Sequence, residues 1–159
     1  MTSFTEQLKN RRTEDGRWLQ GCEHTTLLLN HQIRNRVILQ CIKDIRNSNV
    51  DFDTIACSGT SGLLTVPQIS EILKKNILVV RKRKEKSYSP FQYEGPIPNK
   101  YIILDDLICS GRTVRHINKT IRDDTPSAEC VGVYVFFKDK CAYRNNASLC
   151  KKHLGIPYL

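Results

Sequence analysis

The sequence has no run of apolar residues long enough to cross a membrane, and its first residues lack the apolar core of a secretory signal peptide. It also contains no internal repeat and no low-complexity tract. The seven cysteines are spread singly and are odd in number, which argues against a complete disulfide framework. We therefore expect a cytoplasmic protein with reduced cysteines and no membrane partner.

Aromatic residues are also few, at 8% of the chain, and they are not interleaved with the basic cluster at residues 81–86. A stacking platform for single-stranded nucleic acid is therefore poorly supported. Positive charge is abundant instead: the formal net charge is +9, so we expect a partner that carries phosphate groups. Net charge alone does not separate small polyanions from nucleic acid, although nucleic acid is not the favoured partner.

Two Cys–His pairs, Cys22 with His24 and Cys150 with His153, place metal-ligating side chains near the two ends of the chain. If the ends meet, two thiolates and two imidazoles could bind zinc. The spacing is loose and such pairs are usually coincidental, so the sequence leaves a structural metal undecided.

The most informative segment is residues 101–113, where an apolar run is followed by two adjacent carboxylates and a turn of small residues. The apolar run predicts a buried parallel strand, and the spacing of Val114, Ile117 and Ile121 predicts a helix after the turn. Open α/β sheets bind anions at such a strand–helix junction. Gly111 allows a positive φ and a close approach of the backbone to the ligand.

The two carboxylates, Asp105 and Asp106, would repel each other in a cradle built for phosphate alone. We therefore expect them to bind sugar hydroxyls or a divalent cation. Ser110 and Thr113 can add hydroxyl donors to the anion site. Phosphate, polyol and cation together indicate a sugar phosphate; the alternative is another α/β protein whose acids only cap the turn.

This segment resembles the signature of the type I phosphoribosyltransferases, which bind phosphoribosyl pyrophosphate (PRPP). The resemblance implies that Asp105 and Asp106 are catalytic, contact the ribose hydroxyls and bind the cofactor Mg²⁺, mostly through water. It also implies that the following turn holds the 5′-phosphate. The residues of this turn are Cys109, Ser110, Gly111, Arg112 and Thr113.

An earlier strand and turn match the same family in the expected order. The strand is expected at residues 53–58 and the following helix at residues 63–75. The turn between them resembles the family's pyrophosphate loop, where small residues let backbone N–H groups approach the diphosphate. Its residues are Ser58, Gly59, Thr60, Ser61 and Gly62. Alone this turn is weak evidence, because such turns are common in α/β proteins.

The basic cluster follows a third apolar strand, expected at residues 77–80. It resembles the cationic strand end of the family, from which a mobile loop closes over PRPP. The resemblance implies that Arg81 and Lys82 bind pyrophosphate and that Lys84 or Lys86 is a catalytic loop lysine, because the departing diphosphate carries several negative charges. The alternatives are a solvated charge run and a nucleic-acid or localisation patch.

The resemblance implies an α/β, Rossmann-like fold with a mostly parallel central sheet flanked by helices. With 159 residues the chain suits one domain and a sheet of five strands. The core is expected at about residues 27–137, and a hood from the chain ends at about residues 1–26 and 138–159. A lid is expected at about residues 83–100. Local patterns further predict an amphipathic helix at residues 29–47, irregular structure at 11–26 and a buried strand at 131–137.

The function implied is transfer of the phosphoribosyl group of PRPP to a nucleobase, by a homodimer. Orotate is slightly favoured: relatives that use 6-oxopurines carry an aspartate where Cys109 stands, and orotate enzymes have a similar cationic strand end. Phe136, Phe137 and Lys138 are candidates for base contact, although core packing explains Phe136 equally well. The alternative is a regulator that kept the fold and binds a nucleotide or RNA without turnover.

Overall fold

The computed structural model describes residues 23–82, 89–137 and 155–159. Several residues singled out by the sequence fall outside these ranges. They are Lys84, Lys86 and Lys138 of the predicted site, and Cys22, Cys150 and His153 of the candidate zinc site.

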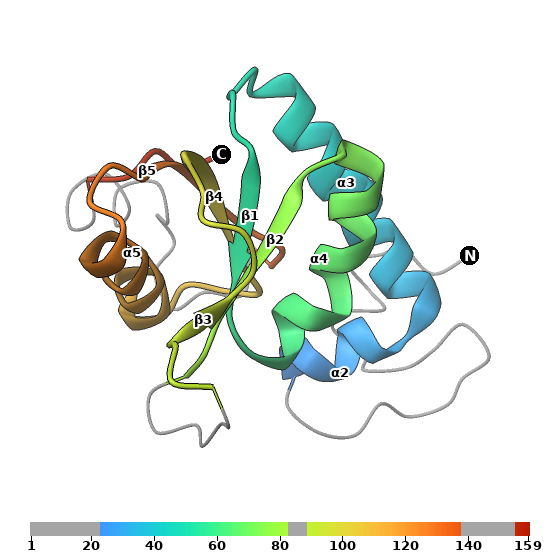
Figure 1. The fold of residues 1–159 in the computed structure, drawn as a ribbon. Coiled ribbons are helices and arrows are strands. Elements are labelled where there is room, and N and C mark those ends of the chain that lie inside the picture. Colours follow the sequence, from blue (N-terminus) through green and yellow to red (C-terminus); the bar gives the residue numbers. More distant parts are fainter. Residues whose placement is uncertain (1–22, 83–88, 138–154) are drawn as a thin grey trace.

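A five-stranded sheet forms the centre of the molecule, with the strand order β3-β2-β1-β4-β5 (Figure 1). The strands are β1 (Thr54–Cys57), β2 (Asn76–Val80), β3 (Tyr93–Glu94), β4 (Lys100–Asp105) and β5 (Glu129–Val135). All neighbouring strands are parallel except β3, which pairs antiparallel with β2. The mostly parallel five-stranded sheet is as predicted. The sequence did not indicate β3, because two residues show no strand periodicity and form a strand only by pairing with β2.

Helices cover both faces of this sheet. They are α2 (Glu23–Leu29), α3 (His31–Asn47), α4 (Gly59–Leu73) and α5 (Arg112–Asp124). Figure 1 shows α3 and α4 on one face and α5 on the other, and a separate apolar cluster lies beneath each layer. Coverage on both faces explains why every residue of β1 is buried. No helix in the described ranges is long and apolar enough to cross a bilayer.

The amino-terminal helical region differs from the prediction at its start. The chain is already helical from Glu23, within a segment expected to be irregular, and α2 and α3 are separate helices. Asn30 divides them: its backbone is extended, and its side-chain oxygen accepts a hydrogen bond of 3.0 Å from the amide of Ile33. This contact caps α3. The turn of direction at Asn30 lets Leu27 and Leu28 pack against Ile33.

The last five residues lie along the edge of the sheet. The amide of Val133 in β5 donates to the carbonyl of Pro157, and the amide of Leu159 donates to the carbonyl of Val133, at 2.8 and 2.9 Å. The Leu159 side chain packs over Gly132, where its Cδ1 lies 2.6 Å from the position that a Cβ would occupy. These residues belong to the segment expected to form a hood, and they pair with β5 along its open edge.

Candidate functional site

The three segments singled out by the sequence meet in one cavity at the carboxyl edge of the parallel strands. The cavity has a volume of about 340 Å³ and is lined by residues 105–114, Ser58, Thr60, Ser61, Lys82 and Thr25. Because β1 lies between β2 and β4 and runs parallel to both, the residues after these strands are brought to the same edge of the sheet. We call this space the first cavity.

Two carboxylates form the floor of the first cavity, directly after β4. Asp105 is buried, and its Oδ1 accepts a hydrogen bond of 2.9 Å from the amide of Asp106. The Asp106 Oδ1 accepts from the amide of Leu107 at 2.8 Å. The backbone carbonyls of both acids accept from the amides of Phe136 and Phe137. These bonds hold both side chains in place before any ligand arrives.

Burial changes the proton affinity of the deeper acid. It raises the pKa of Asp105 to about 8, and the negative charge of Asp106 acts in the same direction. The positive charge of Lys82 opposes this rise only in part. A ligand that brings hydroxyl donors or positive charge to Asp105 would favour its ionised form.

The turn after these acids has the geometry of an anion cradle. Gly111 has a φ of +69° and stands at the amino end of α5, so its predicted left-handed conformation is confirmed. Two arginines brace the turn: Arg112 Nε donates to the hydroxyl of Ser110 at 3.2 Å, and Arg115 Nη2 donates to the carbonyl of Ser110 at 2.7 Å. The amino end of α5, with its unpaired amides, therefore lies at the first cavity, which Arg112 also lines.

The second turn is shorter than the sequence indicated. Helix α4 begins at Gly59 rather than at residue 63, because Gly59, with a φ of +74°, makes the change from strand to helix in one residue. Thr60 and Ser61 are thus in the first helical turn and line the first cavity. Gly62 does not line it; a Cβ at this position would lie 2.7 Å from the Cβ of Cys57, so this glycine serves close packing.

Ser58 carries a buried hydroxyl to which the described residues offer no hydrogen-bond partner. The residue is only 5% exposed, lines the first cavity and precedes α4, but its side chain does not cap that helix. A buried polar group without a partner is costly, so such groups in folded proteins commonly meet a ligand. Ser58 is therefore available to an anion bound at the start of α4.

The two cations at the end of β2 point in different directions. The Lys82 side chain lies over Gly59, where its Cε is 2.6 Å from the position that a Cβ would occupy, and it lines the first cavity. Arg81 does not line this cavity. The structure therefore brings Lys82 to the site, and it gives no support to the predicted diphosphate contact of Arg81.

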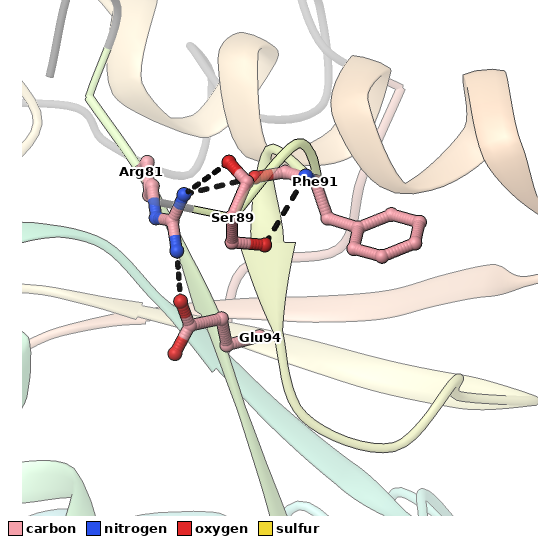
Figure 2. Close-up of polar contacts among 4 residues, drawn as sticks. All are labelled: Arg81, Ser89, Phe91 and Glu94. Carbon is pink, nitrogen blue, oxygen red and sulfur yellow. Dashed lines mark hydrogen bonds and ion pairs between the residues drawn. The ribbon is translucent and has the colours of Figure 1, made fainter. Parts of the chain in front are cut away.

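Arg81 instead fastens the hairpin that joins β2 to β3 (Figure 2). Its Nη1 donates to the carbonyls of Ser89 and Phe91 at 3.2 and 3.1 Å, and its Nη2 pairs with the carboxylate of Glu94. The side chain of Arg81 is only 13% exposed. These contacts hold residues 89–94 against the end of β2, just before Lys82.

We expect Arg81→Ala to loosen this hairpin. Loss of the contacts to Ser89, Phe91 and Glu94 should lower the free energy of unfolding by about 1–3 kcal/mol, because hydrogen bonds from a charged donor are lost together. Hydrogen exchange should quicken at the β2–β3 amides. Glu94→Gln is the milder control, since it keeps a hydrogen-bond acceptor and should cost less than about 1 kcal/mol. Equal protection in wild type and Arg81→Ala would show that β3 is held by other contacts.

The two aromatic candidates for base contact belong to the core. Phe137 is 3% exposed and packs among Leu27, Leu28 and Ile33 of the amino-terminal helices. The Phe136 ring lies edge-on to that of Tyr134, with centroids 6.0 Å apart. Neither lines the first cavity. Phe137 is buried, whereas Phe136 is half-buried and packs against the apolar cluster beneath α3 and α4.

Two residues that contribute to the site were not predicted. Thr25 of α2 lines the first cavity, and His116 of α5 donates from Nε2 to the carbonyl of Arg81 at 2.8 Å. The second contact joins the helix after the phosphate turn to the strand end that carries Lys82. No local pattern marks either residue, because each acts through an element that is distant in the sequence.

Solved structures of phosphoribosyltransferases have a similar fold. Orotate phosphoribosyltransferase from Francisella tularensis is 17% identical, with a TM-score of 0.64; the match covers 96% of this chain and 81% of that chain. Adenine phosphoribosyltransferase from Saccharomyces cerevisiae is 16% identical, with a TM-score of 0.60 and coverages of 84% and 81%. UMP synthase from Leishmania donovani is 22% identical, with a TM-score of 0.64. That match covers 85% of this chain but 28% of UMP synthase, so this chain spans less than a third of that protein.

No protein-family model matches the chain, and a search of curated proteins finds no significant match. The structural likeness nevertheless extends over most of the chain. The chain therefore has the type I phosphoribosyltransferase fold, as its sequence resemblance implied.

Proposed function

We propose that this protein is a phosphoribosyltransferase that moves the 5-phosphoribosyl group of PRPP to a nucleobase and releases diphosphate. The observation that carries this proposal is the first cavity, in which an acid pair, a phosphate turn and a cationic strand end converge. A phosphate site alone would not require the acid pair, because carboxylates repel phosphate. Together the three parts suit a phosphorylated sugar with a charged leaving group.

Each part has a separate role in the proposed reaction. The turn at residues 109–113 binds the 5′-phosphate, with Gly111 allowing the close approach. Asp105 and Asp106 orient the ribose through its hydroxyls. Ser58 and Lys82 bind the diphosphate at the start of α4, together with the amides of the first helical turn.

The reaction needs no protein nucleophile. The nitrogen of the base forms a bond to C1′ while the bond from C1′ to the diphosphate oxygen breaks, and positive charge develops on the sugar ring. Lys82 stabilises the negative charge on the departing diphosphate, and the floor of the cavity keeps C1′ aligned with the base. Lys84 and Lys86 remain candidates for a second contact to the leaving group.

The acid pair also fits a magnesium ion that is bound chiefly by the substrate. Within the described residues no group of three or more acidic, histidine or cysteine side chains could cage a metal, but two adjacent carboxylates are present. Mg²⁺ keeps several of its waters and is usually held by one or two carboxylates and by substrate phosphates. Asp105 and Asp106 would hold it through water, and the ion would neutralise diphosphate charge.

Orotate is our first choice of acceptor, and adenine is the second. The neutral thiol of Cys109 cannot easily exchange a proton with a 6-oxopurine, which disfavours hypoxanthine, guanine and xanthine. The cationic strand end resembles that of orotate enzymes. A cytoplasmic homodimer completes the proposal.

The direct test is PRPP-dependent release of diphosphate with a panel of bases in the presence of magnesium. We expect turnover with orotate, and we expect Lys82→Gln to lower kcat/KM by about 10²-fold, since it removes one stabilising charge from the leaving group. Lys43→Gln, a change of the same charge on the exposed side of α3, should leave the rate unaltered. If no base supports release of diphosphate, the enzymatic function is wrong. RNA binding that weakens with salt would then favour the regulator, which the net charge of +9 would suit.

A further inference from the structure

A second cavity, of about 490 Å³, adjoins the first on the side of α5. Four cations line it, Lys82, Arg112, Arg115 and Lys119, and none of the described residues in its wall carries a carboxylate. The two cavities share Ser58, Lys82, Arg112 and Thr113. Arg115 and Lys119 line the second cavity only, so the proposed transferase reaction does not account for them.

The charges at the amino end of α5 oppose the dipole of the helix. Arg112 and Arg115 lie in its first turn, where no acid is present, whereas the last turn holds two acids, Asp123 and Asp124, beside one base, Arg122. Helices are stabilised by the reverse arrangement, because the amino end already carries partial positive charge. Such an unfavourable placement of charge on a helix is most often found at a binding site, where a bound ligand offsets the loss of stability. An anion beside the first two turns of α5 would offset both the dipole and the two arginines.

The two arginine side chains are exposed at the wall of the second cavity. Arg112 Nε and Arg115 Nη2 each use one N–H group on Ser110, at 3.2 and 2.7 Å. A guanidinium has five N–H groups in a planar fork, so each arginine keeps donors for a phosphate. The ammonium of Lys119 pairs with Asp123 at 2.6 Å, and both side chains of this pair are more than half exposed. An ion pair this exposed is weak and leaves Lys119 able to contact an anion.

The unpartnered hydroxyl of Ser58 is a second observation that points to a ligand. Ser58 is 5% exposed, and within residues 23–82, 89–137 and 155–159 its Oγ finds no hydrogen-bond partner. Because Ser58 lines both cavities, the residue lies at their junction. Its hydroxyl has a single O–H, so it can donate to one anion only, and a phosphate in either cavity would satisfy it.

We propose that the second cavity is a separate binding site for a phosphate group that does not belong to the sugar phosphate in the first cavity. Its ligand is inorganic phosphate or the terminal phosphate of a polyphosphate chain. The inference goes beyond the proposed function and does not depend on it, because the site is defined by Arg115 and Lys119. If the first cavity is also filled, the protein holds two separate groups of phosphates, joined at Ser58 and Lys82.

The test is a calorimetric titration of the full chain with inorganic phosphate at constant ionic strength. We expect Arg115→Gln with Lys119→Gln to weaken phosphate binding by at least about tenfold, because two charge-assisted contacts are lost. The control, Lys43→Gln with Arg122→Gln, removes the same charge from exposed positions outside both cavities and should change affinity less than about twofold. Equal affinity in the two double variants would overturn the proposal.

Two further arms keep this result separate from other effects. In the described part of the chain, Lys119 makes its hydrogen bond and ion pair with Asp123 and none with the phosphate turn. A loss of affinity in the single variant Lys119→Gln therefore cannot come from damage to that turn. Wild-type protein saturated with PRPP should still bind inorganic phosphate, and tripolyphosphate should bind more tightly than inorganic phosphate if a polyphosphate is the ligand. If PRPP does not bind, the result counts against the proposed transferase function. The comparison of phosphate affinity between the two double variants remains valid in that case. The second site would be refuted if PRPP abolished phosphate binding and if Arg115→Gln with Lys119→Gln left that binding unchanged. The phosphate would then be assigned to the first cavity.

Discussion

Replacing Asp105 and Asp106 together by asparagine is expected to lower phosphoribosyl transfer by at least about 10³-fold while the protein stays folded. The two carboxylates are held by the amides of Asp106 and Leu107, and an amide oxygen can accept the same hydrogen bonds. The fold should therefore persist. What is lost is the negative charge that orients the ribose hydroxyls and supports magnesium.

A matched control for this variant is available at the end of α5. Asp123 and Asp124 are also adjacent acids, but they lie exposed at the far end of α5. Asp123→Asn with Asp124→Asn also replaces two adjacent carboxyl groups by amides and should leave kcat/KM within about twofold of wild type. Diphosphate release and circular dichroism would be measured on both double variants. Wild-type turnover in the Asp105 and Asp106 variant would remove the acid pair from the mechanism.

A single change, Asp105→Asn, should stabilise the free protein at alkaline pH even though it impairs turnover. Burial raises the pKa of Asp105 to about 8 in the folded state, above the usual value of an unfolded aspartate. Between pH 4 and 8 the folded state therefore binds more protons than the unfolded state at this position. Stability contributed by Asp105 is complete at acidic pH and is lost as the pH rises toward 8.

Chemical denaturation from pH 5 to 8.5 would test this sign. We expect the unfolding free energy of Asp105→Asn to exceed that of wild type by about 1–3 kcal/mol at pH 8 and to match it more closely at pH 5. A constant difference across this range would show that Asp105 is ionised throughout, as an exposed carboxylate would be. Saturating magnesium with PRPP should reduce the difference, because the ligand stabilises the ionised form of the wild type.

Asp53 supplies a comparison of opposite sign. Burial alone would raise the pKa of this carboxyl, but hydrogen bonds from the Thr54 hydroxyl and from the amides of Lys100 and Asn99 outweigh burial and lower it. Its contribution to stability is therefore present at neutral pH and is lost as the pH falls through the lowered folded pKa. Asp53→Asn should destabilise the protein at pH 7, with the difference from wild type shrinking in acid.

The sequence alone determined the parts of this protein whose structure depends on neighbouring residues. The strand, acid pair, glycine turn and helix at residues 101–121 were predictable because an apolar run, a residue that tolerates positive φ and helical spacing all act locally. The parallel sheet followed from the alternation of such units. These local signals also marked the residues that line most of the first cavity.

Tertiary structure decided the features that depend on contacts between distant segments. Arg81 and Lys82 are adjacent and equally basic, yet one fastens the β2–β3 hairpin and the other lines the cavity, because successive residues of an extended chain point to opposite sides. Phe137 became a core residue only where α2 and α3 cover it. The second cavity likewise exists only because the end of β2 lies beside α5. The sequence determines the chemistry of each side chain. The direction in which a side chain points, and the groups that it contacts there, depend on how the layers pack.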